Sequence, residues 1–199
     1  MLTPRSISGL TLIELLIAIV LLALLTAIAM PAYSNWMLNL KVRNAAESIQ
    51  NGLNMARTEA IRRNRNVRFQ LVNNLTASCV LSASASNWVI SLDDTTGLCN
   101  HAASATTAPR LIQKRASGDG STFATVATIN SNNTATSTNV IFDGQGQLVA
   151  SATPITVINF DTSINASASR NLRLTIANPG GQIRLCDPNV SPQTDPRGC

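Results

Sequence analysis

The sequence predicts an α+β protein with one long N-terminal helix, apolar in its first half and amphipathic in its second, packed on an antiparallel β-sheet head. Three observations lead to this fold class. An uninterrupted apolar segment covers residues 10–30, a stripe with helical spacing follows as far as residue 63, and from residue 66 the hydrophobic pattern has a period of two. The expected parts are a leader (1–9), a transmembrane helix segment (10–30), an amphipathic helix (31–65) and a β-rich globular head (66–199).

The apolar segment has 21 residues, and its only ionisable side chain is that of Glu14. A helix of this length spans about 30 Å, the thickness of one hydrocarbon core. A carboxylate within it costs about 2.5–3.5 kcal/mol on insertion scales, so an intramembrane Glu indicates a function and a partner. We expect the partner of Glu14 to be a backbone amine.

The block Gly9-Leu10-Thr11-Leu12-Ile13-Glu14 resembles the prepilin signature of type IV pilins and type II secretion pseudopilins. In that family a prepilin peptidase cuts after the Gly and methylates the new amine, and the Glu neutralises the amine of a neighbouring subunit during assembly. The resemblance implies cleavage between Gly9 and Leu10, N-methylation of Leu10 and an assembly role for Glu14. Residues 1–9, polar and with the single charge of Arg5, are typical of a cytoplasmic leader.

Two other interpretations of the N-terminus compete with this one. A plain signal anchor would leave Glu14 without a role, which its insertion cost disfavours. A secretory signal peptide cut after Ala27-Ile28-Ala29 has the A-x-A form. Against it, the apolar run is longer than a typical h-region and the helical pattern continues beyond that cut.

The amphipathic helix is predicted by apolar residues spaced three and four apart, and this stripe is expected to bury against a sheet. Its members are Leu38, Val42, Ala45, Ala46, Ile49, Leu53, Ala56 and Ala60. Pro31 lacks an amide N–H and is expected to break or kink the helix just beyond the membrane. The family resemblance implies the same kink at Pro31.

Five arginines lie within twelve residues around the predicted end of this helix: Arg57, Arg62, Arg63, Arg65 and Arg68. Cations in a last turn complement the helix dipole, each contributing about 0.3–1 kcal/mol. The alternative is a basic patch for nucleic acid or acidic partner subunits, although the aromatic residues of a stacking platform are missing. The run 56–63 resembles the H-type subgroup of pilin-like proteins, which contains FimU- and FimT-type minor pilins and the GspH pseudopilin.

Period-two patterns and turn residues predict the strands of the head. They are expected at 66–71, 88–92, 111–112, within 123–129, and at 139–142, 147–149, 156–160, 171–177 and 182–186. In the first strand Arg68 and Gln70 should face solvent and Phe69 the core. Polar low-complexity pieces at 102–108 and 130–134 predict loops, and the order of pairing within residues 72–138 stays open.

The final hairpin permits a prediction of register. With a turn at 178–181, Thr175 pairs with Arg184, which makes Arg173 and Arg184 near-diagonal neighbours on the outer face. FimT-type minor pilins that bind DNA carry Gly-Arg-x-Arg at the corresponding hairpin, whereas residues 181–184 here are Gly-Gln-Ile-Arg. The missing first arginine weakens electrostatic binding, so DNA contact by Arg173 and Arg184 is the minor expectation.

Four cysteines in an exported chain predict two disulfides. Of three possible pairings we prefer the sequence-local one, Cys79 with Cys99 and Cys186 with Cys199. The first would close a loop of about 20 residues and stabilise by about 3 kcal/mol on the chain-entropy estimate. The single histidine, His101, is expected in a loop, and no spacing suggests a zinc site.

Composition adds little to the functional argument: charged residues make up 13% of the chain, and the net charge of +5 is compatible with a polyanion or an anionic surface without establishing either. No nucleophile motif or carboxylate pair is recognisable, so we expect neither an enzyme nor a cofactor. The resemblance implies a FimU-type minor pilin in the bacterial inner membrane, single-pass with its head in the periplasm, that helps to initiate a type IV pilus and sits at its tip.

The same resemblance leaves two alternatives, a GspH-type minor pseudopilin of type II secretion and a FimT-type DNA-binding minor pilin for natural transformation. The implied partners are the prepilin peptidase, other minor and major pilins or pseudopilins, and the inner membrane.

Overall fold

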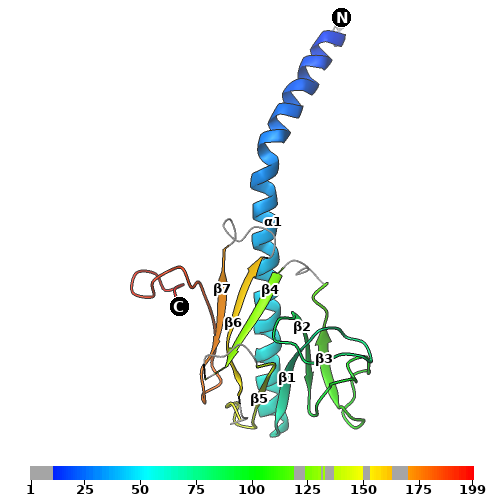
Figure 1. Ribbon diagram of the computed structural model, residues 1–199, viewed down its shortest axis with the longest axis vertical. Helices are drawn as coiled ribbons and strands as arrows, with labels where there is room; N and C mark the ends of the chain where they lie inside the picture. The colour runs from blue at the N-terminus through cyan, green and yellow to red at the C-terminus, as the bar shows by residue number, and fades with distance from the viewer. Residues whose placement is uncertain (1–10, 119–123, 131, 133–136, 150–152, 163–169) are drawn as a thin grey trace, which may run out of the picture. The chain divides into compact units, whose positions relative to one another are not determined.

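The computed structural model describes residues 11–118, 124–130, 132, 137–149, 153–162 and 170–199, apart from the side chain of Pro31. In this part of the chain one helix, α1 (Leu12–Arg63), precedes the strands (Figure 1). These are β1 (Val67–Val72), β2 (Asn87–Ser91), β3 (Leu111–Arg115), β4 (Ala124–Asn130), β5 (Asn139–Phe142), β6 (Ile155–Thr162), β7 (Leu172–Ile176) and β8 (Ile183–Cys186). The chain forms two compact units, which divide between Met37 and Leu38.

The first unit contains the apolar beginning of α1. Its apolar side chains are exposed, and none of its most apolar stretch is buried within the protein. By length and composition this helix can cross a membrane. Residue 31 lies inside α1, so the predicted break at Pro31 is not observed. A proline can remove one backbone hydrogen bond without ending a helix, and a kink at this position stays a prediction.

The second unit holds two four-stranded sheets in which every neighbouring pair is antiparallel. Their strand orders are β3-β2-β1-β5 and β4-β6-β7-β8. One hydrophobic cluster joins the C-terminal part of α1 to both sheets, and Figure 1 shows strands of the two sheets along this part of the helix. The predicted packing of an amphipathic helix on antiparallel sheet structure is therefore confirmed.

The predicted helical stripe forms the centre of this cluster. From Val42 to Ala60 its members are buried, and Leu38 at its beginning is half-buried. Gly52 lies in the same stripe, where a Cβ atom would come within 2.8 Å of the Phe69 ring and 3.0 Å of the Trp88 ring. Because this position has no side chain, the two rings pack directly on the helix backbone. Their centroids lie 5.8 Å apart, and the indole Nε1 of Trp88 donates a hydrogen bond to Ser48 Oγ at 3.0 Å.

Strands β1 and β2 differ from the half-buried strands that alternation predicted. Both are covered on both faces, and Gln70, expected in solvent, is 1% exposed. The outer face is covered because a second cluster packs there, built from residues of β1, β2 and β3 and from the disulfide between Cys79 and Cys99. Alternation within one strand carries no information about a distant segment that covers its outer face.

Gln70 is the polar centre of this covered face. Its Oε1 accepts hydrogen bonds from the backbone N–H of Thr95 at 3.1 Å and from Thr95 Oγ1 at 3.0 Å. Its Nε2 donates to Asp94 Oδ1 at 2.9 Å. The backbone N–H and the hydroxyl of Thr96 donate to the same Asp94 oxygen. One glutamine side chain thus holds the 93–97 turn against β1.

The remaining strands agree with the sequence pattern except at one place. The segment 147–149 was expected to be a strand, but Leu148 forms only an isolated bridge to Phe142. Its backbone N–H points away from β5 and donates to the carbonyl of Pro179 at 2.8 Å. The segment still returns beside β5, since the N–H of Val149 donates to the Ile141 carbonyl and the N–H of Asp143 donates to the Gln147 carbonyl, both at 2.9 Å. Predicted strands at 111–112, 123–129 and 156–160 correspond to β3, β4 and β6, although residue 123 lies outside the described residues.

We predict that Gln70→Ala lowers the free energy of unfolding of the second unit by about 1–3 kcal/mol, because it leaves buried hydrogen-bonding groups of the 93–97 turn without their partner. Urea denaturation of residues 38–199 measures this. Gln113→Ala, on an exposed position of β3, is the matched control and should change stability by less than about 0.5 kcal/mol. Equal stabilities for the two variants would contradict the assigned role of Gln70.

Candidate functional site

The N-terminal motif is described from Thr11 onward, and the predicted cleavage residues Gly9 and Leu10 lie outside the described residues. The hydroxyl of Thr11 accepts a hydrogen bond from the backbone N–H of Glu14 at 3.4 Å, and the Thr11 carbonyl accepts from the N–H of Leu15 at 3.2 Å. Thr11 therefore caps α1, and Glu14 is the acidic residue of its first turn. The sequence signal for this cap is the Thr-x-x-Glu spacing, which is typical of a helix N-terminus.

The apolar side chains that follow Glu14 along the helix are not buried against any described part of the protein. The large apolar residues from Leu12 to Met30 are exposed on every side of α1. A helix that is hydrophobic all round is stable in a membrane or in a bundle of other apolar helices. The first turn places one negative charge at the positive end of the helix dipole, at the edge of this apolar surface.

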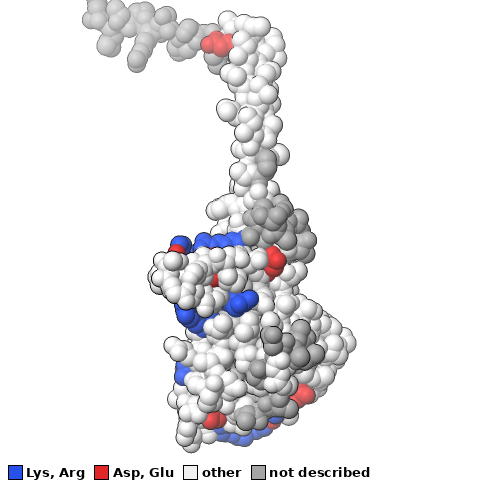
Figure 2. Space-filling view, turned by 60° about the vertical axis from the view of Figure 1, so that its left-hand side comes forward, with Lys and Arg blue, Asp and Glu red and all other residues white. Residues whose placement is uncertain are grey.

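The β7–β8 hairpin has the register that the sequence predicts. Thr175 pairs with Arg184, and Arg173 pairs with Cys186. The N–H of Ala177 donates to the carbonyl of Gln182 at 2.9 Å, which closes the turn. Figure 2 shows Lys and Arg side chains gathered on the face that carries β7 and the C-terminal loop (187–199).

Both arginines of this hairpin are committed to hydrogen bonds within the chain. Arg173 Nε donates to Asn159 Oδ1 on the neighbouring strand at 2.8 Å. Arg184 Nη2 donates to the carbonyls of Pro196 at 3.1 Å and Gly198 at 2.7 Å. Arg184 thus ties the C-terminal loop to β8, a role that the sequence pattern did not indicate.

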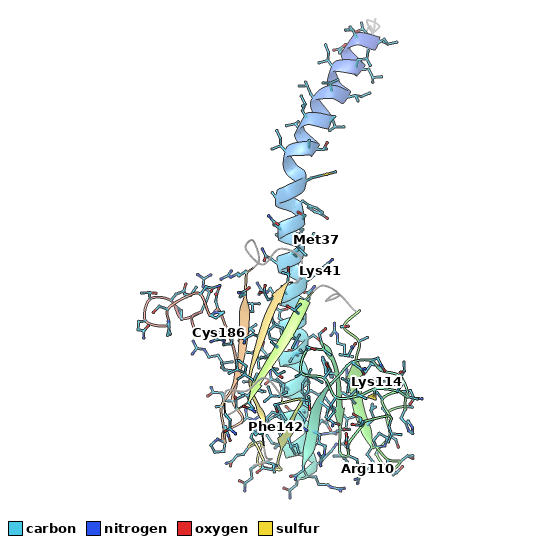
Figure 3. The ribbon with its side chains drawn as sticks, viewed as in Figure 1. Met37, Lys41, Arg110, Lys114, Phe142 and Cys186 are labelled. Carbon is cyan, nitrogen blue, oxygen red and sulfur yellow. A yellow bond between two sulfur atoms is a disulfide. The ribbon has the colours of Figure 1, made fainter. Side chains whose placement is uncertain are left out.

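The C-terminal loop is tied at several further points. The disulfide joins Cys186 to Cys199 (Figure 3), and the N–H of Asp187 donates to the Arg197 carbonyl at 2.7 Å. The buried Asp187 carboxylate accepts a hydrogen bond from Arg170 Nε at 2.9 Å. With Cys79–Cys99, this is the sequence-local disulfide pairing that was preferred from the sequence.

Asp195 and Arg197 form an ion pair inside this loop, with Arg197 Nη2 and Asp195 Oδ2 2.6 Å apart. The guanidinium and the backbone N–H of Arg197 both donate to this carboxylate. These bonds lower the pKa of Asp195 from 3.8 to about 2, because they favour its charged form.

Arg57 fixes two turns that are distant in the sequence. Its Nε donates to the Gly146 carbonyl at 2.9 Å, and its Nη2 donates to the Gly180 carbonyl at 3.4 Å. The two turns also touch directly, since a Cβ atom on Gly181 would lie 2.3 Å from the Gly146 oxygen. With a φ of 65° as well, position 181 requires glycine. Arg57 is therefore a structural clamp of the head and not one of the cations of the last helical turn.

Arg62 and Arg63 do lie in the last turn of α1, and both pair with Glu59, at 2.8 and 2.7 Å. The hydrogen bond from Arg62, with that from Arg63, lowers the pKa of Glu59. Just before β3, Arg110 forms a bidentate ion pair with Asp93, and its hydrogen bonds lower the pKa of the Asp93 carboxyl (Figure 3). Of these residues, Arg62 and Arg63 belong to the arginine run, and their place in the last turn agrees with the dipole-complementing interpretation.

Among the described residues no group of three or more His, Cys, Asp or Glu side chains is placed to hold a metal ion. His101 lies exposed in a loop, as expected, and its carbonyl accepts a hydrogen bond from Lys114 Nζ at 3.0 Å. The same Nζ donates to the Cys99 carbonyl at 2.8 Å. Lys114, a residue of β3, thus ties the segment 99–101, next to the Cys79–Cys99 disulfide, to that strand.

Comparison with models of known protein families shows which family this chain belongs to. Residues 45–191, which include most of the second unit, match the family described as type II transport protein GspH. This chain belongs to the GspH family. Residues 4–30 match the prokaryotic N-terminal methylation motif, which covers the predicted cleavage site and the apolar segment. The GspH family consists of structural pilin-like subunits, the minor pilins and pseudopilins.

Two solved structures are similar to this GspH-family chain, both crystal structures of the type IV minor pilin FimU of Pseudomonas aeruginosa strain PAO1. The first is 20% identical over 76% of this chain and 97% of FimU, with a TM-score of 0.46. The second is 19% identical over 76% and 92% of the two chains, with a TM-score of 0.45. No curated protein matches the sequence.

We predict that the carboxyl of Asp195 titrates with a midpoint near pH 2 and that Arg197→Gln moves the midpoint toward 3.8. Because the pKa is lowered in the folded state, the ion pair stabilises the loop above pH 3.8 and this stabilisation is lost as the pH falls to about 2. Carboxyl-carbon NMR measures the midpoint. Arg115→Gln, on an exposed position of β3, is the control, and an unchanged midpoint in Arg197→Gln would contradict the assignment.

Proposed function

We propose that this chain is a minor pilin that helps to initiate a type IV pilus and sits at its tip. In this proposal the prepilin peptidase cuts after Gly9 and methylates Leu10. The apolar part of α1 then anchors the subunit in the bacterial inner membrane with the head in the periplasm. Membership of the GspH family and the methylation motif at residues 4–30 support the processing and the filament class.

The observation that carries the proposal is the single carboxylate of Glu14 beside an apolar surface exposed on all sides of the helix. Such a surface is stable only in lipid or against other apolar helices. An unpaired carboxylate costs about 2.5–3.5 kcal/mol at the centre of a membrane helix, so pairing is favoured wherever the helix enters the hydrocarbon. The amine of a neighbouring subunit, freed by cleavage before residue 10, supplies the opposite charge. Glu14 thereby selects a correctly processed neighbour during assembly.

The head supplies the surface that contacts the other minor subunits. Two disulfides and the clamp formed by Arg57 give it a fixed shape. A rigid head on a helix that packs into a filament core is suited to a short initiating complex, in which each subunit presents a different surface. The proposed partners are the prepilin peptidase and other minor and major pilins.

A minor pseudopilin of type II secretion is the second candidate. The observation that favours it is the description of the matched family, which names type II transport. Processing, anchoring and pairing through Glu14 are the same for both machines, so the two candidates differ only in the filament entered. Deletion of the gene distinguishes them, because loss of surface pili supports the first candidate and loss of protein export supports the second.

DNA binding through the β7–β8 hairpin has weaker support. Arg173 and Arg184 already donate hydrogen bonds to Asn159 and to the carbonyls of the C-terminal loop, and the hairpin has glutamine in place of an arginine at position 182. A surface with fewer arginines that can reach a phosphate binds DNA less tightly and with a weaker salt dependence. We therefore place DNA uptake after the two filament candidates.

We predict that Glu14→Leu leaves membrane insertion intact and reduces incorporation into filaments by about tenfold or more, equivalent to about 1.4 kcal/mol or more. Leucine keeps the helix apolar but cannot pair with an amine. Immunoblots of membranes and of sheared filaments measure the two pools.

Thr26→Val is the matched control for this variant. Thr26 is also a polar residue of the apolar segment, but its hydroxyl bonds within its own helix, to the Ala23 carbonyl at 2.9 Å. This variant should assemble normally. Filaments that incorporate Glu14→Leu as well as they incorporate Thr26→Val would refute the pairing role.

A further inference from the structure

Two aromatic residues on α1 are used neither by the core nor by the proposed assembly contact. Tyr33 is 62% exposed and Trp36 is 56% exposed. They are three residues apart, so they share one helix face, and their ring centroids lie 5.9 Å apart. Tyr33 is the only tyrosine of the chain. The second tryptophan, Trp88, is 3% exposed and belongs to the core.

The position of this pair along the helix corresponds to the far side of a bilayer. With a rise of about 1.5 Å per residue, Tyr33 lies about 32 Å and Trp36 about 36 Å from Leu12. The hydrocarbon core is about 30 Å thick, and the bilayer with its headgroup layers is about 40–45 Å thick. If Leu12 marks one boundary of the hydrocarbon, both rings therefore reach the opposite headgroup layer.

The chemistry of the two rings fits that layer. Each combines a flat apolar body with one polar group, the Tyr33 hydroxyl or the Trp36 indole N–H. Tyrosine and tryptophan are enriched where a membrane protein passes from hydrocarbon to water, because the ring replaces acyl-chain contacts while the polar group stays hydrated. Exposure of two such rings directly after a long apolar run is otherwise unfavourable for a helix in water.

We propose that Tyr33 and Trp36 form an interfacial anchor that binds the lipid headgroup layer on the periplasmic side of the inner membrane. The pair fixes the depth of α1 in the bilayer. Glu14 lies 22 residues before Trp36, or about 33 Å along the helix, so the anchor holds this carboxylate at the cytoplasmic boundary. There it is available to a neighbouring amine without crossing the bilayer centre. This inference rests on the membrane-anchored form in the proposed function.

Depth-dependent fluorescence quenching tests the inference on the full chain in vesicles of phosphatidylethanolamine and phosphatidylglycerol. Trp88→Phe leaves Trp36 as the single tryptophan. Lipids brominated near the headgroup should quench Trp36 more strongly than lipids brominated near the bilayer centre. In a matched variant with Trp36→Phe, Trp88→Phe and Leu21→Trp, the tryptophan lies near the middle of the span and the order should reverse.

In the variant Trp36→Phe the only remaining tryptophan is Trp88, in the head. Its fluorescence should not be quenched by either brominated lipid. If Trp88→Phe fails to fold, the difference in quenching between the wild-type chain and Trp36→Phe gives the same information. Chains that float with the vesicles but show no bromine quenching of Trp36 would overturn the anchor and indicate that this face contacts protein instead. Chains that do not float at all would overturn the proposed membrane function itself.

Discussion

The second unit depends on the close approach of α1 to the aromatic rings of β1 and β2 at Gly52. With no side chain at this position, Phe69 and Trp88 lie against the helix backbone. Ala45, Ala46, Ala56 and Ala60 are the other small residues of the buried stripe. Residues of both sheets can therefore reach one helix face and form a single cluster. A larger residue at Gly52 would push against two buried rings, for which overpacking costs about 1–3 kcal/mol.

The same helix meets a different constraint in the first unit. There its surface is apolar on all sides and carries the charge of Glu14 in its first turn. A helix that packs on sheets needs apolar residues along only one stripe, whereas a helix in lipid or within a bundle of helices needs them around its whole circumference. The change from one pattern to the other along a single helix is the physical basis for proposing that the first unit is the anchor and the second unit the folded head. The methylation motif matched at residues 4–30 agrees with a membrane-anchored first unit.

Features that depend on residues close together in the sequence could be predicted from it. The stripe from Val42 to Ala60 has helical spacing, and the pairing of Thr175 with Arg184 follows from the position of one turn. The two disulfides join cysteines only 20 and 13 residues apart. In each case the interacting residues lie within a short segment, although for the cysteines the sequence left three pairings open and only favoured the local one.

Features that depend on distant segments could not be predicted in this way. Gln70 is buried because a separate lobe, closed by Cys79 and Cys99, covers the outer face of β1. Arg57 was grouped with the cations of the helix end, although it bonds carbonyls 89 and 123 residues further along the chain. No periodicity in the sequence encodes such contacts.

The N-terminal residue of the mature protein tests the central claim most directly. Intact-mass and N-terminal analysis of the protein from membranes, with and without the prepilin peptidase, should find methylated Leu10 at the N-terminus only when the peptidase is present. That result would establish a subunit with a free amine for pairing and with Glu14 as its fifth residue. A protein that starts at Met30 and is free in the periplasm would contradict the account, because cleavage there removes both Glu14 and the apolar segment.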